Sequence, residues 1–168
     1  MNDAQVSIRT ATPRDAEGLR TMFARSSSES IYLRFHIPFP EVPEWMMALM
    51  SDTDHQQKEA LVSVAEGRIV GHAMYARLGD GTEAEMAIIV EDRWQSKGVG
   101  KALLSELAHR ARLQGIETFI AEVLETNRPM LALAAMFAGT GYSLKGGVCH
   151  LRVPLRMASE VRTLHRAA

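Results

Sequence analysis

Apolar positions recur along this chain with two different periods, which predict strands in some segments and helices in others. Residues 84–90 are largely apolar and rich in β-branched side chains, as expected of a buried strand. A later segment has apolar side chains at helical spacing, at Val99, Leu103, Leu107 and Ala111. Gly115 then suits a left-handed helix end. The pattern predicts a strand, a short loop and an amphipathic helix in succession.

The same periods predict the remaining elements. Strands are expected at residues 6–10, 59–66, 68–78, 82–90 and 118–124, and residues 142–155 can supply two more. Helices are expected at 13–25, 44–50, 99–114 and 129–138, with a polar connection at 26–30. The helix at 99–114 gives a connection long enough for strands 82–90 and 118–124 to run parallel. The predicted fold class is α/β (α+β): a mixed, mostly antiparallel sheet with one central parallel pair and helices on both faces.

Composition places the chain among ordinary globular proteins. Its 168 residues suit a single domain at 1–155, followed by a tail at 156–168 that is either solvated or packed on a second subunit of a homodimer. With 19 basic and 20 acidic residues, no charge excess indicates nucleic acid or a membrane surface as partner. Cys149 is the only cysteine, and no signal or membrane-spanning pattern is visible, so a cytoplasmic location is expected.

The loop between strand 82–90 and helix 99–114 carries the strongest chemical signal. Its residues are Gln95, Ser96, Lys97, Gly98, Val99, Gly100 and Lys101. The loop delivers backbone N–H groups at a helix N-terminus, where the helix dipole favours an anion by roughly 0.3–1 kcal/mol. The two glycines lack the Cβ atoms that would hold an anion away, and the two lysines add cationic donors. We expect a diphosphate to bind here, and a turn without a ligand is the alternative.

Two common nucleotide-binding patterns do not fit this loop. A P-loop needs four residues between its glycines and a Lys-Ser/Thr after the second one. The dinucleotide fingerprint needs a third glycine where this chain has Leu103.

The loop instead resembles the acetyl-CoA loop of the GNAT (Gcn5-related N-acetyltransferase) superfamily, Gln/Arg-x-x-Gly-x-Gly/Ala, and the likeness extends over residues 84–138. More narrowly, several separated segments are similar to the acetyltransferase domain of bacterial Pat-type protein-lysine acetyltransferases. These are Ala84-Glu85, Trp94-Gln95, residues 123–131 and residues 28–35. The resemblance implies acetyl-CoA as cosubstrate and a protein lysine ε-amine as acceptor. No metal is expected, because His36, His55 and His109 show no metal-ligand spacing with cysteine or acidic residues. A small-molecule amine, a protein N-terminus, or a non-catalytic acyl-CoA sensor are the alternatives.

Acetyl transfer to lysine requires a general base. A lysine with a pKa near 10.4 is neutral in only about one molecule in 2,500 at pH 7. Glu83 and Glu85 share one strand face by alternation, so either carboxylate could serve directly or through one water. The resemblance places the catalytic glutamate at Glu85, and an exposed strand carboxylate without a role is the alternative.

The resemblance also implies residues that hold the pantetheine arm. Backbone groups of Ile88, Ile89 and Val90 would bind its amides, and Asn127 would contact it from the end of the next strand. A helix N-cap is the competing role for Asn127. Many family members have a tyrosine as general acid where this chain has Ala134. Tyr142 is expected to pack in the core or over the cofactor.

Other reactive side chains fit this chemistry less well. Cys149 and His150 would lie on opposite faces of a strand, so they cannot act as nucleophile and base. His72 is expected to be a core histidine with its hydrogen bonds satisfied. Tyr32 and Arg34 are expected to shape the acceptor side, and a helix packed over the sheet is the alternative for their segment.

Overall fold

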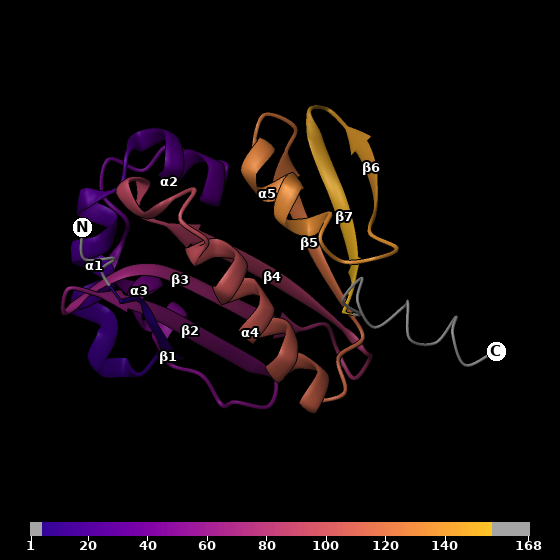
Figure 1. Ribbon diagram of the computed structural model, residues 1–168, viewed down its shortest axis with the longest axis horizontal. Coiled ribbons are helices and arrows are strands. Elements are labelled where there is room, and N and C mark those ends of the chain that lie inside the picture. The colour runs from indigo at the N-terminus through magenta and orange to yellow at the C-terminus, as the bar shows by residue number, and fades with distance from the viewer. Residues whose placement is uncertain (1–4, 156–168) are drawn as a thin grey trace.

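The computed structural model describes residues 5–155, which form one seven-stranded sheet covered by helices on both faces (Figure 1). The strands are β1 (Ser7–Thr10), β2 (Lys58–Ala65), β3 (Arg68–Arg77), β4 (Glu83–Val90), β5 (Thr118–Leu124), β6 (Gly141–Lys145) and β7 (Val148–Pro154). Across the sheet their order is β1-β2-β3-β4-β5-β7-β6, and all neighbours are antiparallel except β4 and β5. The predicted fold class is confirmed.

The helices divide into two groups. They are α1 (Ala16–Arg25), α2 (Ser28–Phe35), α3 (Glu44–Ser51), α4 (Val99–Leu113) and α5 (Arg128–Ala134), with 3-10 turns at Pro13–Asp15 and Asp92–Trp94. One buried cluster joins α4 and α5 to the sheet through residues such as Leu103, Leu107 and Phe119. A second joins α1, α2 and α3 to the opposite face through residues such as Met22 and Val62. The apolar stripe predicted for helix 99–114 is the stripe that α4 buries.

The parallel pair at the centre of the sheet is joined at one end only. Pairing between β4 and β5 covers Glu83–Glu85 and Thr118–Ile120 and then stops. Beyond that point the two strands diverge, with α2 and α5 flanking the open end (Figure 1). Backbone N–H and C=O groups are obligatory hydrogen-bonding groups, so the facing edges of the diverging strands need partners other than each other. The unpaired edges of β4 and β5 can therefore form hydrogen bonds with a ligand that lies between the two strands.

Two predicted boundaries are wrong, both for local reasons. The expected polar connection at 26–30 is partly helical, because Ser27 caps α2 and its Oγ accepts a hydrogen bond from the Ser30 N–H at 3.1 Å. Serines that resemble a loop in sequence are here the N-terminus of a helix. Helix α5 ends at Ala134, four residues before its expected end at Ala138. The predicted tail at 156–168 lies outside the described residues.

No helix within residues 5–155 is both long and apolar enough to cross a bilayer.

Candidate functional site

The loop before α4 has the backbone of an anion-binding turn. The φ angle is positive at Ser96 (57°) and at Gly98 (82°), with Lys97 between them outside that region. This alternation turns successive N–H groups toward one side. The first hydrogen bond of α4 runs from the Ala102 N–H to the Gly98 carbonyl at 3.0 Å, so the N–H groups of the first turn have no partner inside the helix. The loop presents a concave set of donors.

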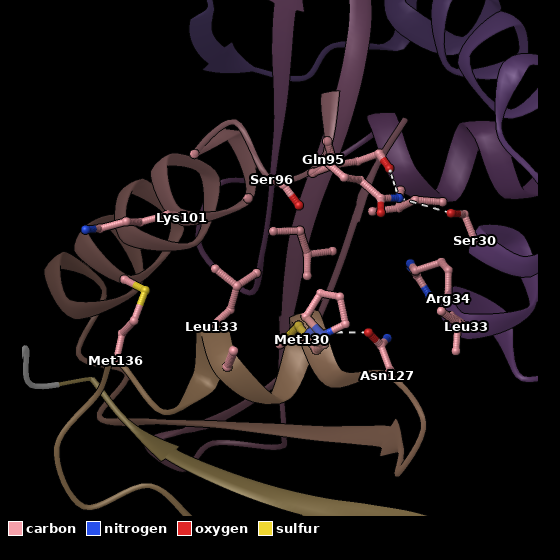
Figure 2. A pocket seen from close by; sticks show the side chains of 17 residues that line it. Ser30, Leu33, Arg34, Gln95, Ser96, Lys101, Asn127, Met130, Leu133 and Met136 are labelled. Carbon is pink, nitrogen blue, oxygen red and sulfur yellow. Dashed lines mark hydrogen bonds between the residues drawn. The ribbon is translucent and has the colours of Figure 1, made fainter. Parts of the chain in front are cut away.

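These donors face a cavity of about 380 Å³ between β4, the loop, α2 and α5 (Figure 2). Most of the residues predicted to bind the cofactor line it: Ile88, Ile89, Val90, Gln95, Ser96, Gly98, Gly100, Lys101 and Asn127. Two others do not. The Val99 side chain is buried in the core, and the Lys97 ammonium lies 5.2 Å from the centre of the Trp94 ring. A Cβ atom on Gly100 would lie 3.1 Å from Cδ1 of Leu133, so this glycine also allows α4 and α5 to approach closely.

Gln95 and Asp92 connect the loop to α2. The Gln95 side-chain amide donates to the Val90 carbonyl at 3.0 Å and to the Ser30 hydroxyl at 3.1 Å. The Asp92 carboxylate accepts from the Ser27 N–H at 2.8 Å and from the hydroxyls of Ser27 and Ser30. Burial opposes ionisation of Asp92, but these hydrogen bonds outweigh it and lower its pKa. The loop that presents the donors therefore also fixes the helix on the other side of the cavity.

The sequence interpretation missed this connection. The signal was present, because three serines at a helix start and an aspartate before the glycines are all short polar residues that bond to backbone. Their pairing joins positions more than sixty residues apart, which a local pattern does not show.

Asn127 has the capping role that competed with cofactor binding. Its Oδ1 accepts from the Met130 N–H at 3.2 Å at the start of α5. The cap uses only the oxygen, and Asn127 also lines the cavity, so its side-chain NH₂ is a donor that the cap does not use.

A second cavity of about 230 Å³ adjoins the first and contains the candidate base. Glu85 lines it, together with residues from α2 and β5. Five residues line both cavities, and these are Leu33, Arg34, Ile88, Asn127 and Met130. The cavities therefore meet where β4 and β5 have diverged.

The structure also separates the two carboxylates that alternation left equivalent. Glu83 forms an ion pair with Arg152 on β7, and it lines neither cavity. Glu85 has no such ion pair within the described chain and faces the second cavity. Glu83 and Glu85 therefore share one face of the strand, but only Glu85 lines one of the two cavities.

Four other residues considered in the sequence analysis line neither cavity. Tyr142 is 69% exposed on the edge strand β6 and lines neither cavity, so the expectation that it packs in the core or over the cofactor is wrong. Ala134 is the buried last residue of α5. Cys149 is buried, while His150 pairs with Glu122 on the opposite face of the sheet. Within residues 5–155, no group of three His, Cys, Asp or Glu side chains has an arrangement that could hold a metal ion.

His72 is fully buried, with its Nε2–H donating to the Met50 carbonyl at 2.9 Å. Its Nδ1 has no hydrogen-bond partner among the described residues, so the histidine is only half satisfied. Burial is the main cause that lowers the pKa of His72 to about 4, and the positive charge of Arg34 lowers it further. The hydrogen bond to the Met50 carbonyl has the opposite effect and raises the pKa. His72 is therefore neutral at physiological pH.

This shift predicts a pH dependence of stability. Between the ordinary pKa of 6.5 and the folded value of about 4, the unfolded chain binds the proton more readily. The contribution of neutral His72 to the free energy of unfolding is therefore fully present above pH 6.5. It is lost as the pH falls toward 4, and the total loss is about 3 kcal/mol. His72→Gln keeps a donor for Met50 without titrating. Denaturant unfolding over this range should show a shallower pH slope for the variant, and equal slopes would contradict the assignment.

Comparison with known proteins identifies the class. A profile of the acetyltransferase (GNAT) family matches residues 23–139, well over half of the chain. The chain therefore belongs to the acetyltransferase (GNAT) family, and the predicted resemblance is confirmed. It is an N-acetyltransferase, an enzyme class whose acyl donor is acetyl-CoA.

Individual relatives agree with this result. The crystal structure of the GNAT domain of S. lividans PAT has a TM-score of 0.82 and 31% identity, covering 89% of this chain and 90% of that one. Acetyltransferase Pat of Mycolicibacterium smegmatis is 29% identical over 126 residues, which are 73% of this chain and 38% of that protein. L-amino acid N-acetyltransferase AaaT of Escherichia coli K12 is 27% identical over 158 residues, 86% of this chain and 92% of that protein. The chain thus spans well under half the length of the M. smegmatis protein.

Proposed function

We propose that this protein transfers the acetyl group of acetyl-CoA to the ε-amine of a protein lysine by direct attack, with Glu85 as general base. The observation that carries the proposal is the meeting of two cavities at the divergence of β4 and β5. One cavity contains the donors of the loop, and the other contains Glu85.

The residues divide into three roles. Backbone N–H groups from Ser96 to Lys101 bind the diphosphate of the donor. The open edge of Ile88, Ile89 and Val90, with the Asn127 NH₂, bonds to the amides of the pantetheine arm and directs the thioester toward the junction. Glu85 takes the proton of the attacking amine. Positioning of amine and thioester in attack geometry supplies several kcal/mol more.

The choice of a protein lysine rests on the likeness to the S. lividans PAT domain, which is the strongest of the comparisons above. A cytoplasmic location is consistent with this acceptor and with the single cysteine, and it is part of the proposal. The tail at 156–168 as a dimer contact stays a prediction.

Cofactor binding can be tested before the acceptor is known. A ligand present at about 100 times its Kd stabilises the folded state by about 2.7 kcal/mol. We expect acetyl-CoA to raise the thermal unfolding temperature by several degrees, and adenosine to have no such effect at the same concentration. An unchanged unfolding temperature with acetyl-CoA would contradict the proposed donor site.

The acceptor requires a separate experiment. Candidate proteins incubated with enzyme and acetyl-CoA are analysed by mass spectrometry, with Glu85→Gln protein as the inactive reference. Acetyl-lysines that depend on the active enzyme would support the proposal. A panel of free amino acids, assayed by CoA release, addresses the alternative that the likeness to the E. coli enzyme favours. Turnover on the panel without protein acetylation would replace the lysine by a small-molecule amine.

A further inference from the structure

Arg34 is a cation at the junction of the two cavities that forms no ion pair with a carboxylate of residues 5–155. It projects from α2 and lines both cavities, on the side of the site opposite the loop helix α4 (Figure 2). Its Nε is buried without a hydrogen bond, and within residues 5–155 no carboxylate forms an ion pair with its guanidinium. Taking a charge out of water without pairing it is costly. The side chain therefore favours a ligand that brings negative charge to this point.

The guanidinium is held in place rather than free to find a partner elsewhere. Its Cζ lies 4.7 Å from the centre of the Phe35 ring. That ring contacts Phe23 and Phe39, at centroid distances of 5.7 Å and 5.4 Å. The start of α2 is fixed by the hydrogen bonds of Asp92 described above. Burial lowers the pKa of Arg34 to about 10, which the Glu85 charge opposes, so the group stays cationic at neutral pH.

Glu85 and Arg34 both line the second cavity, but they do not form an ion pair. A carboxylate and a guanidinium therefore share one cavity with space between them. Acyl transfer from a thioester to an amine develops positive charge on nitrogen and negative charge on the carbonyl oxygen. Glu85 suits the first charge and Arg34 suits the second.

We propose that Arg34 stabilises the oxyanion formed when the acceptor amine attacks the acetyl thioester. The proposal rests on the proposed acetyl transfer and adds a second catalytic residue to it. Donors that are already oriented toward a developing charge act more strongly in a water-poor site than in water. The aromatic support of Arg34 provides this orientation before the substrate binds.

The step conserves atoms and electrons as follows. The lone pair of the neutral amine forms the C–N bond, and the π electrons of the carbonyl move onto oxygen next to Arg34. The amine proton passes to Glu85, directly or through one water. The oxyanion then re-forms the C=O bond as the C–S bond breaks. The electron pair of the broken C–S bond leaves with sulfur as the CoA thiolate. The proton taken up by Glu85 passes through solvent to that thiolate, which restores the carboxylate and gives the CoA thiol.

A binding experiment without turnover tests this role. S-carboxymethyl-CoA places a carboxylate close to the position of the acetyl carbonyl, whereas S-ethyl-CoA is neutral there. Calorimetry should show that wild-type protein prefers the carboxymethyl compound, and that Arg34→Met reduces this preference about tenfold or more, because a hydrogen bond to a charged group is lost. Arg34→Lys should retain part of it. Arg93→Met, a matched loss of one arginine outside both cavities, should leave the preference unchanged.

Kinetics provide the second measurement. We expect Arg34→Met to lower kcat by about 100-fold with little change in the Kd of CoA or the KM of the amine. A higher amine KM at unchanged kcat would assign Arg34 to acceptor binding and overturn the proposal. An equal preference for the two CoA compounds in the wild type would also overturn it. Because binding of S-ethyl-CoA tests the donor site separately, a failure of the proposed function is distinguishable from a failure of the Arg34 role.

Discussion

Glu85→Gln is expected to lower kcat/KM for acetyl transfer to lysine at pH 7 by about 10²–10⁴-fold, the usual contribution of a positioned general base. The amide has nearly the shape of the carboxylate but cannot accept the proton, so donor binding should not change. Initial rates of CoA release, measured with a thiol reagent, provide the test. The deficit should shrink as the pH approaches the lysine pKa near 10.4, because the neutral amine then forms without help.

Glu83→Gln is the matched control for this prediction. It makes the same chemical change two residues earlier on the same strand face, where the carboxylate pairs with Arg152 outside both cavities. We expect nearly wild-type turnover from it. If both variants lost activity equally, or if Glu85→Gln retained full activity, Glu85 would not be the base.

Gly98→Asp is expected to weaken binding of acetyl-CoA by at least about 100-fold relative to Gly98→Asn. Asp and Asn are among the side chains that best tolerate a left-handed backbone, such as the φ of 82° at this position. Apart from the adjoining backbone, a Cβ atom here would meet no atom of residues 5–155 within 4 Å, so neither variant should disturb packing. A carboxylate roughly 5 Å from one phosphate charge costs about 3 kcal/mol at an effective dielectric constant near 20. Calorimetric titration of acetyl-CoA measures the difference.

The pair of variants isolates charge from size. Added salt should restore part of the affinity of Gly98→Asp and affect Gly98→Asn much less, because screening acts on the repulsion. Equal affinities for the two variants at low salt would mean that the diphosphate does not lie at this end of α4.

Most of this fold could be predicted because its central strands and helices show the hydrophobic periodicity and the end residues typical of their type. Strand β5 at Thr118–Leu124 has the predicted bounds, and Gly115 has the predicted positive φ, at 75°. The boundary at α2 was wrong because serines suit both loops and helix starts. In the structure the helix start is fixed by the Ser27 cap and by the distant Asp92 carboxylate, which bonds to Ser27 and Ser30.

The candidate site could be predicted to the extent that its residues lie in one stretch of chain. Residues 95–101 are continuous in sequence, and in the structure they form the loop and the first turn of α4. The amide of Gln95 was expected at the cofactor, but its hydrogen bonds to the Val90 carbonyl and the Ser30 hydroxyl join β4 to α2. Alternation left Glu83 and Glu85 equivalent, and the family resemblance alone favoured Glu85. The folded chain distinguishes them, because Glu83 forms an ion pair with Arg152 of β7 across the sheet. The sequence did not predict that Arg34 forms no ion pair within residues 5–155, because ion pairing between distant residues is a property of the folded chain.

The short ladder between β4 and β5 has a consequence for the donor itself. Pairing is confined to Glu83–Glu85 and Thr118–Ile120, so the two halves of the sheet, β1 to β4 and β5 to β7, are joined by only a short stretch of hydrogen bonds. A pantetheine arm lying in the gap with its amides bonded to the strand edge would act as a surrogate strand. Acetyl-CoA would then be a structural part of the sheet as well as a substrate. The surface that the acceptor contacts would be complete only when acetyl-CoA is bound.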